Sequence, residues 1–194
     1  MRDVVLSVPY FKQYNEFACG AAAFEMVFRY LKPKTLSKFS QAKMYAELSE
    51  AVPNWFGAFR ITTDNIVDFA KRRGLHAGWG RAHPTPERFL AQLELALIDN
   101  GIPLIACQRL ERAPNIGHFR VVIGWANPSM VILNDPEDPD GAYWPLDRFL
   151  DYWRSSPGGN VTGGVAIWIA KKPVDLGLLP DQPNPWADNP VVIH

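Results

Sequence analysis

The chain has 194 residues, 47% of them hydrophobic and 21% charged, which is the composition of an ordinary globular protein. Twenty Lys and Arg residues balance twenty Asp and Glu residues and are scattered along the chain. We therefore expect no nucleic-acid partner, because such binding needs an excess of groups that neutralise phosphate. We also predict no membrane span, since no apolar run approaches the roughly 20 residues that cross a bilayer.

The N-terminal ten residues, "MRDVVLSVPY", lack the apolar core of a secretory signal. As the sequence stands, this favours a cytoplasmic protein. An exported mature form whose signal has been removed fits the sequence as well. Only two cysteines are present, and their spacing resembles no disulfide framework, so free thiols in a reducing compartment are the simpler interpretation.

Residues 4–11 have the pattern of an extended segment, and the next element is helical. Residues 19–31 are apolar on nearly every side, which predicts a buried helix. Its only charged residues, Glu25 and Arg29, are four apart and can form an ion pair. We expect this helix to end before Pro33, because proline disfavours helical geometry at the residue that precedes it.

Three more helices are predicted before the middle of the chain, at residues 40–51, 62–74 and 85–101. The second should begin at a capping Thr63 or Asp64 and end at Gly74. Between these helices, residues 52–59 form a loop rich in aromatic residues, and residues 75–82 form a short strand or loop. Most aromatic residues are core residues, although Trp55, Phe56 and Phe59 on this loop are also candidates for the wall of a substrate cleft.

The second half of the sequence has the pattern of strands. Short β-branched runs separated by turn signals occur at residues 102–110, 118–125, 130–136 and 163–172, with an amphipathic helix at 144–159. Helices that precede strands in this way indicate an α+β fold, with an antiparallel sheet beside a helical part. We predict one domain over residues 1–172, followed by an extended proline-rich tail at 173–194.

Cys19 lies where the first extended segment turns into a helix. A thiol at a helix N-terminus faces unpaired backbone N–H groups and the positive end of the helix dipole, which both favour the thiolate. This is a suitable position for a nucleophile, and Gly20 beside it would leave room for a substrate chain. Cys107, within a predicted strand, is interpreted as a core residue.

A metal site or cofactor is not expected. The four histidines are dispersed, and the sequence has neither a zinc-binding spacing nor a phosphate-binding or dinucleotide-binding loop. The histidines are His76, His83, His118 and His194.

Acyl transfer to a thiol also requires donors for the oxyanion and a base. The backbone N–H of Cys19 and the side-chain amide of Gln13, six residues upstream, are candidate donors. His118 begins a predicted strand and is the candidate base.

The orienting group for this base depends on strand register. If the turn "ANPS" pairs Trp125 with Met130, then Arg120 lies opposite Asp135, and the imidazole is diagonal to that carboxylate on the same face. A carboxylate there would orient the imidazole and stabilise its charged form. A change of one residue would bring Asn134 to this face, so both residues remain candidates.

Several segments together carry a resemblance to a known family. They are "VPYFKQYNEFACGAAAFEMVFRYL", "NGIPLIACQ", "GHFRVVIGW", "VILNDPEDP" and "WPLDRFLDYW", in this order. This arrangement, over roughly residues 5–170, resembles the bacteriocin-processing, double-glycine-type cysteine peptidases and their stand-alone relatives, which are papain-like. The resemblance implies a central helix that bears the nucleophile, packed on an antiparallel sheet that bears the histidine.

The resemblance also assigns roles by position. It implies Cys19 as the nucleophile, His118 as the general base, Asp135 as the group that orients the histidine and Gln13 as the oxyanion donor. The expected function is hydrolysis of a peptide or amide bond in a peptide or small-protein substrate, without a cofactor. An acyltransferase using the same acyl-enzyme and a non-catalytic peptide-binding module are the alternatives. The sequence leaves the oligomeric state open.

Overall fold

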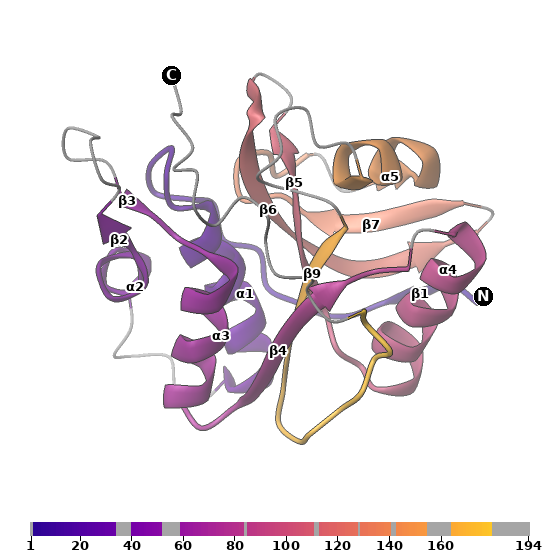
Figure 1. Cartoon of the computed structure of the whole chain (residues 1–194), viewed down its shortest axis with the longest axis horizontal. Helices are drawn as coiled ribbons and strands as arrows, with labels where there is room; N and C mark the ends of the chain where they lie inside the picture. The colour runs from indigo at the N-terminus through magenta and orange to yellow at the C-terminus, as the bar shows by residue number, and fades with distance from the viewer. Residues whose placement is uncertain are drawn as a thin grey trace.

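The buried helix that begins at Cys19 lies against an antiparallel sheet in the computed structural model of the chain (Figure 1). The structure describes residues 2–33, 40–51, 59–83, 85–110, 113–127, 129–140, 143–154 and 164–179. Of the aromatic loop, Trp55 and Phe56 lie outside these residues, and only the backbone of Phe59 is described. Most of the predicted tail, residues 180–194, also lies outside them.

The helices follow the predicted order. They are α1 (Cys19–Leu31), α2 (Gln41–Leu48), α3 (Thr63–Arg72), α4 (Pro86–Glu94) and α5 (Leu146–Arg154). The predicted limits of the first helix are confirmed. After α4 the chain widens into a π-helix, η2 (Leu95–Asp99), which the periodicity did not indicate.

The cap of α3 differs from the prediction. Thr62, and not Thr63 or Asp64, is the N-cap, because its side chain accepts a hydrogen bond from the Asn65 N–H. The side-chain oxygen Oδ1 of Asn65 accepts the Thr62 N–H in return, which completes a capping box. Gly74 follows the helix with a φ of 72°, a conformation that favours glycine, as the predicted stop requires.

The strands form one main antiparallel sheet and one small pair. They are β1 (Val4–Val5), β2 (Glu50–Ala51), β3 (Phe59–Arg60), β4 (His76–Arg81), β5 (Leu104–Leu110), β6 (Ala113–Ala126), β7 (Met130–Asn134), β8 (Tyr143–Pro145) and β9 (Val165–Ala170). The main sheet has the order β4-β9-β5-β6-β7-β8, and β1 also pairs with β6. The small pair is β2-β3. The antiparallel sheet is as predicted, whereas β8 was expected to be the start of the helix that follows it.

Helices cover both faces of the main sheet. Ile105 and Cys107 of β5 pack with α1 and α3 in one core cluster, and the alternate residues Leu104 and Ala106 pack with α4 and α5 in another. Figure 1 shows α1 and α3 on one side and α4 and α5 on the other. This alternation is the two-residue period of a strand. Cys107 is buried, which confirms its interpretation as a core residue.

Gly20 serves helix packing, and the expected room for a substrate chain is not present beside it. A Cβ atom at this position would lie 2.9 Å from Cγ2 of Ile61 and 3.2 Å from Cδ2 of Phe119. The missing side chain therefore lets α1 approach β6 closely. The predicted role was wrong because the space that glycine opens is filled from within the protein.

The register between β6 and β7 contains a correction. The expected pair of Trp125 with Met130 is wrong, because Trp125 pairs with Val131 and Ala126 pairs with Met130, so the turn is one residue shorter on the β6 side. A bulge at residue 123 then restores the expected register, so that Val121 pairs with Asn134. Continuing this ladder by one residue places Arg120 opposite Asp135.

The first part of the predicted tail packs along the edge of the sheet. Arg81 of β4 and Leu179 exchange two backbone hydrogen bonds of 2.9 and 2.8 Å. Leu176 is buried in the core cluster beside α4 and α5. The domain limit at residue 172 remains a prediction.

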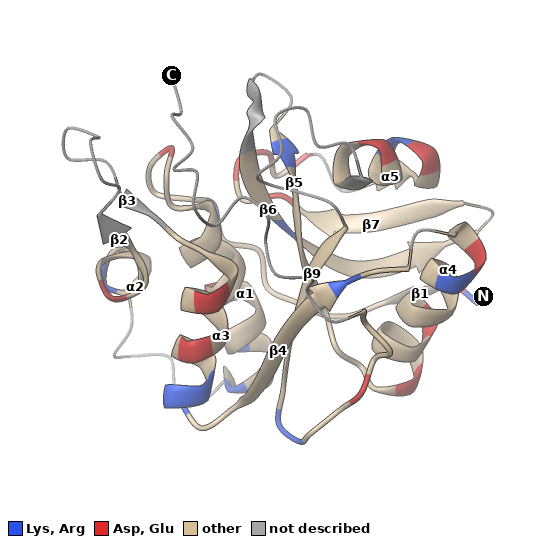
Figure 2. Ribbon diagram, viewed as in Figure 1, with Lys and Arg blue, Asp and Glu red and all other residues tan. Residues whose placement is uncertain are grey.

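Acidic and basic residues both occur on α3, α4 and α5 (Figure 2). Within the described part of the chain, every helix is too short or too polar to span a membrane.

Replacing Thr62 with Ala should lower the free energy of unfolding by about 1 kcal/mol, because the N-cap hydrogen bond is lost. Thr63→Ala is the matched control and should cost less, since Thr63 does not cap the helix. Urea unfolding of both variants measures the difference. A larger loss for Thr63→Ala would contradict the assignment of the cap.

Candidate active site

Cys19 is the first residue of α1, and no side chain caps the start of this helix. The N-cap is Ala18, whose side chain cannot accept a hydrogen bond from the first turn. The N–H groups of that turn are therefore not satisfied by a capping side chain. Cys19 as a residue is partly exposed, whereas most of the helix that follows it is buried. Together these features give Cys19 an electropositive and accessible position.

His118 of β6 forms a hydrogen bond with the Cys19 thiol. Burial by itself raises the pKa of Cys19, but the hydrogen bond and charge of His118 and the N–H groups of Phe119 and Gly20 lower it, and the net pKa is below the ordinary value. The surroundings of Cys19 thus stabilise its thiolate form relative to that of an ordinary cysteine. Cys107 provides the contrast, because burial raises its pKa to about 12.

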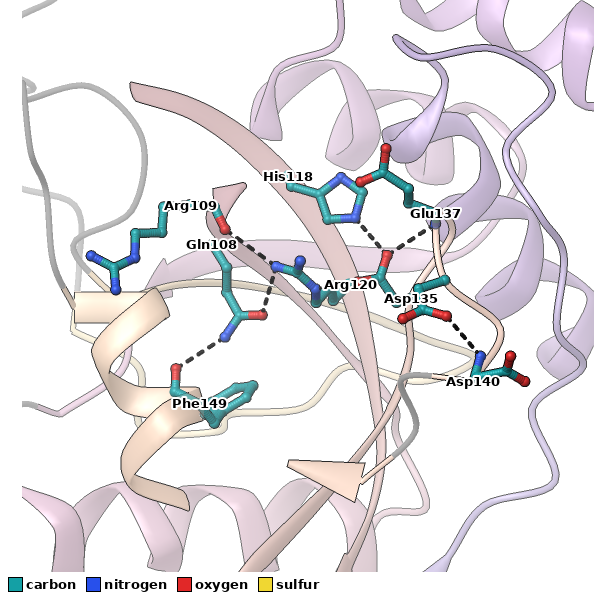
Figure 3. A network of polar contacts seen from close by, with 9 residues as sticks. Gln108, Arg109, His118, Arg120, Asp135, Glu137, Asp140 and Phe149 are labelled. Carbon is teal, nitrogen blue, oxygen red and sulfur yellow. Dashed lines mark hydrogen bonds and ion pairs between the residues drawn. The ribbon is translucent and has the colours of Figure 1, made fainter. Parts of the chain in front are cut away.

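The other side of the His118 ring contacts Asp135, which follows β7. Nε2 of His118 lies 2.6 Å from Oδ1 of Asp135, and both side chains are buried (Figure 3). Burial lowers the pKa of His118, but the hydrogen bonds with Asp135 and Cys19 outweigh it and raise the pKa to about 9. Since an ionised carboxylate only accepts, Nε2 carries the proton of this bond and Nδ1 is left for the thiol.

Asp135 is held in its ionised form by several donors. Burial by itself raises the pKa of this carboxyl, but the hydrogen bond and charge of His118, the Arg120 guanidinium and the backbone N–H of Glu137 lower it well below its usual range. The Glu137 N–H donates to Oδ1 over 2.9 Å. Asn134 makes no such contact with the imidazole. Its side-chain amide donates to the carbonyl oxygen of Val8.

Arg120 links the carboxylate to the opposite helical layer, and the sequence did not predict this role. Its Nε lies 2.5 Å from Oδ2 of Asp135, and its Nη1 lies 3.4 Å from Oε1 of Gln108. The Gln108 amide nitrogen donates to the carbonyl oxygen of Phe149 in α5 (Figure 3). The signal in the sequence was the spacing, because Arg120 is two residues after His118 and therefore on the same face of β6.

Gln13 lies on the segment before α1, beside the turn that follows β7. Its backbone N–H donates to the carbonyl oxygen of Pro136 over 2.8 Å. Its side-chain oxygen Oε1 is buried and has no hydrogen-bond partner. The structure thus brings all four predicted residues to segments that meet at one end of α1.

No group of three or more possible metal-ligating side chains occurs among the residues that the structure describes.

The family to which the chain belongs follows from a direct comparison. The model of the Peptidase_C39 like family matches residues 5–159, which is most of the chain. The chain belongs to the Peptidase_C39 like family. The match includes Gln13, Cys19, His118 and Asp135. No curated protein matched the sequence.

Solved structures of C39 peptidases have the same fold. A C39-like peptidase from Bacillus anthracis superposes with a TM-score of 0.63 at 16% identity, covering 90% of this chain and 100% of that one. A double glycine motif protease from an AMS/PCAT transporter, solved with its leader peptide, has a TM-score of 0.57 at 20% identity, covering 88% of this chain and 99% of that one. The peptidase domain of Streptococcus ComA has a TM-score of 0.57 at 20% identity, covering 85% and 99%. The papain-like α+β fold of this C39-family protein is thereby shown.

Removing Arg120 should destabilise the protein, because a buried carboxylate would lose its cationic partner. We expect Arg120→Met to lower the free energy of unfolding by about 3–5 kcal/mol. Arg109→Met is the matched control, because Arg109 forms an ion pair with the exposed Asp151, and such pairs contribute under about 1 kcal/mol. Urea unfolding measures both variants. Equal small losses would show that the buried ion pair does not stabilise the fold.

Proposed function

We propose that this C39-family protein is a cysteine peptidase that cleaves a peptide or amide bond through Cys19, His118, Asp135 and Gln13. The observation that carries the proposal is the continuous chain from thiol to imidazole to buried carboxylate. Its members come from α1, β6 and the end of β7, so the fold itself brings them together.

The geometry supports an acyl-enzyme mechanism. The Cys19 thiolate attacks the carbonyl carbon of the substrate, and the negative charge develops on the carbonyl oxygen. The Cys19 N–H and the Gln13 amide stabilise this oxyanion. The His118 imidazolium then gives its proton to the leaving amine, and the C–N bond breaks. Water, deprotonated by His118, attacks the thioester and releases the acid and the free thiol.

Asp135 has a supporting role in this mechanism. Its carboxylate holds the ring in the tautomer that presents Nδ1 to the thiol, and its charge stabilises the imidazolium. The substrate class is a peptide or small protein. Support comes from the related protease that was solved with a leader peptide, since a peptide occupies a site on the same fold.

Iodoacetamide alkylation should detect the ion pair. The pKa of Cys19 is below its ordinary value, so alkylation should continue at pH values below the pKa of a free thiol, which is roughly 8.5. The rate should fall only as the pH drops through the lowered pKa of Cys19. His118→Ala removes the hydrogen bond and the charge, so the alkylation profile should move to higher pH. Mass spectrometry of both thiols measures this, with Cys107 as the slow internal control. Equal profiles for the two cysteines would refute the nucleophile assignment.

Cleavage can be tested on a set of peptides that includes a double-glycine sequence, with products identified by mass spectrometry. Cys19→Ala and His118→Ala should each lower the rate by on the order of 10³-fold or more. Asn134→Ala is the matched control for Asp135→Ala, because the two residues are adjacent but only Asp135 contacts His118. Cleavage that survives in Cys19→Ala would exclude the proposed mechanism. Products joined to an added amine would instead indicate acyl transfer.

A further inference from the structure

We infer that Gln41, the first residue of α2, is a positioning residue that sets the location of the oxyanion donor Gln13. The inference rests on the proposed function, because it assigns a partner to one of the groups proposed there. Gln41 is 28 residues away from Gln13 in the sequence and does not need to contact the substrate in this role.

The side-chain amide of Gln41 forms hydrogen bonds with the backbone of the two residues that flank Gln13. Its Oε1 accepts the N–H of Tyr14 over 2.6 Å, and its Nε2 donates to the carbonyl oxygen of Lys12 over 3.0 Å. One side chain therefore satisfies a donor and an acceptor that flank the proposed oxyanion donor. This is the pairing that a neighbouring strand would make, provided here by a side chain.

The opposite edge of the same segment is held as well. The N–H of Gln13 itself donates to Pro136, the residue after Asp135. In an extended chain, a residue's own N–H points to one edge, and the preceding C=O and the following N–H point to the other. The backbone at and beside Gln13 is thus hydrogen-bonded on both sides.

Gln41 is in turn connected to the helix that carries the nucleophile. Its Nε2 also lies 3.4 Å from Oε2 of Glu25, a buried residue of α1. The Oε1 atom of Glu25 is 2.6 Å from Arg29, one turn further along, as the sequence predicted. Since Cys19 begins the same helix, Gln41 joins the Gln13 segment to the element that supplies the other oxyanion donor.

The role of Gln41 is not explained by helix formation. The cap of α2 is Ser40, whose side chain accepts the N–H of Lys43. The segment that Gln41 holds is largely exposed, and Tyr14 retains 50% of its accessible surface. Its hydrogen bonds therefore add little to the core. What they do determine is the place of Gln13 relative to α1.

Two reactions of the Cys19 thiol separate this role from a general effect on the site. Acetylation by p-nitrophenyl acetate proceeds through an oxyanion, as the thiolate adds to the carbonyl carbon and nitrophenolate then leaves. Alkylation by iodoacetamide is a direct displacement of iodide and forms no oxyanion. Neither reagent requires knowledge of the natural substrate. The ratio of the two second-order rate constants thus reports on the oxyanion donors alone.

Gln41→Ala should slow acetylation by at least about tenfold. The effect should not exceed the loss expected when an oxyanion donor is removed altogether. Its alkylation rate and the pH profile of alkylation should stay within about twofold of the wild-type protein, since the thiol and imidazole are untouched. The double variant Gln13→Ala/Gln41→Ala should be no slower in acetylation than Gln13→Ala, because residues that act through one group are not additive.

Ser40→Ala is the matched control, because it weakens α2 at the neighbouring position without removing the Gln41 amide. It should leave the ratio of the two rates unchanged. Equal losses in acetylation and alkylation for Gln41→Ala, or an additive loss in the double variant, would overturn the inference. If Gln13→Ala itself leaves acetylation unchanged, the oxyanion assignment in the proposed function fails. If Gln13→Ala slows acetylation and Gln41→Ala does not, only the role of Gln41 is excluded.

Discussion

The buried carboxylate of Asp135 is the group on which the electrostatics of this site depend. One of its oxygens contacts His118 and the other contacts Arg120. A buried imidazolium without a counter-charge would lose its proton, because burial favours the neutral ring. The hydrogen bond and charge of His118 in turn lower the pKa of Cys19. Asp135 therefore acts on the sulfur indirectly, because its carboxylate stabilises the positive charge of the ring, and Arg120 helps to keep the carboxylate ionised.

The same contacts couple the site to both layers of the fold. Cys19 belongs to the layer of α1 and α3, whereas Arg120 reaches through Gln108 to the backbone of α5 in the other layer. The sheet between them carries the imidazole. A change in packing on either face can thus alter the geometry of the site. Stability and reactivity are linked here by buried polar contacts, which are costly when broken.

The bulge in β6 shows why register is hard to read from a sequence. The expected turn placed Trp125 opposite Met130, but the turn is one residue shorter on the β6 side, and the bulge at residue 123 takes up the extra residue of β6. Asp135 therefore reaches the expected position by a different route. A bulge leaves little trace in the pattern of hydrophobic residues, because it is set by twist and by side-chain packing across the sheet.

The sequence by itself determined the helix that begins at Cys19, the strands around His118 and the order of polar residues that indicated the family. These features are local, since they depend on periodicity, on turn residues and on spacing along the chain. Only the tertiary structure decided that Asp135, and not Asn134, contacts the imidazole. It also decided that Ile61 and Phe119 fill the space beside Gly20. The hydrogen bonds between Gln41 and the segment around Gln13 are a third case. Each of these contacts joins residues far apart in the chain, so the energy that selects it appears only when the layers pack together.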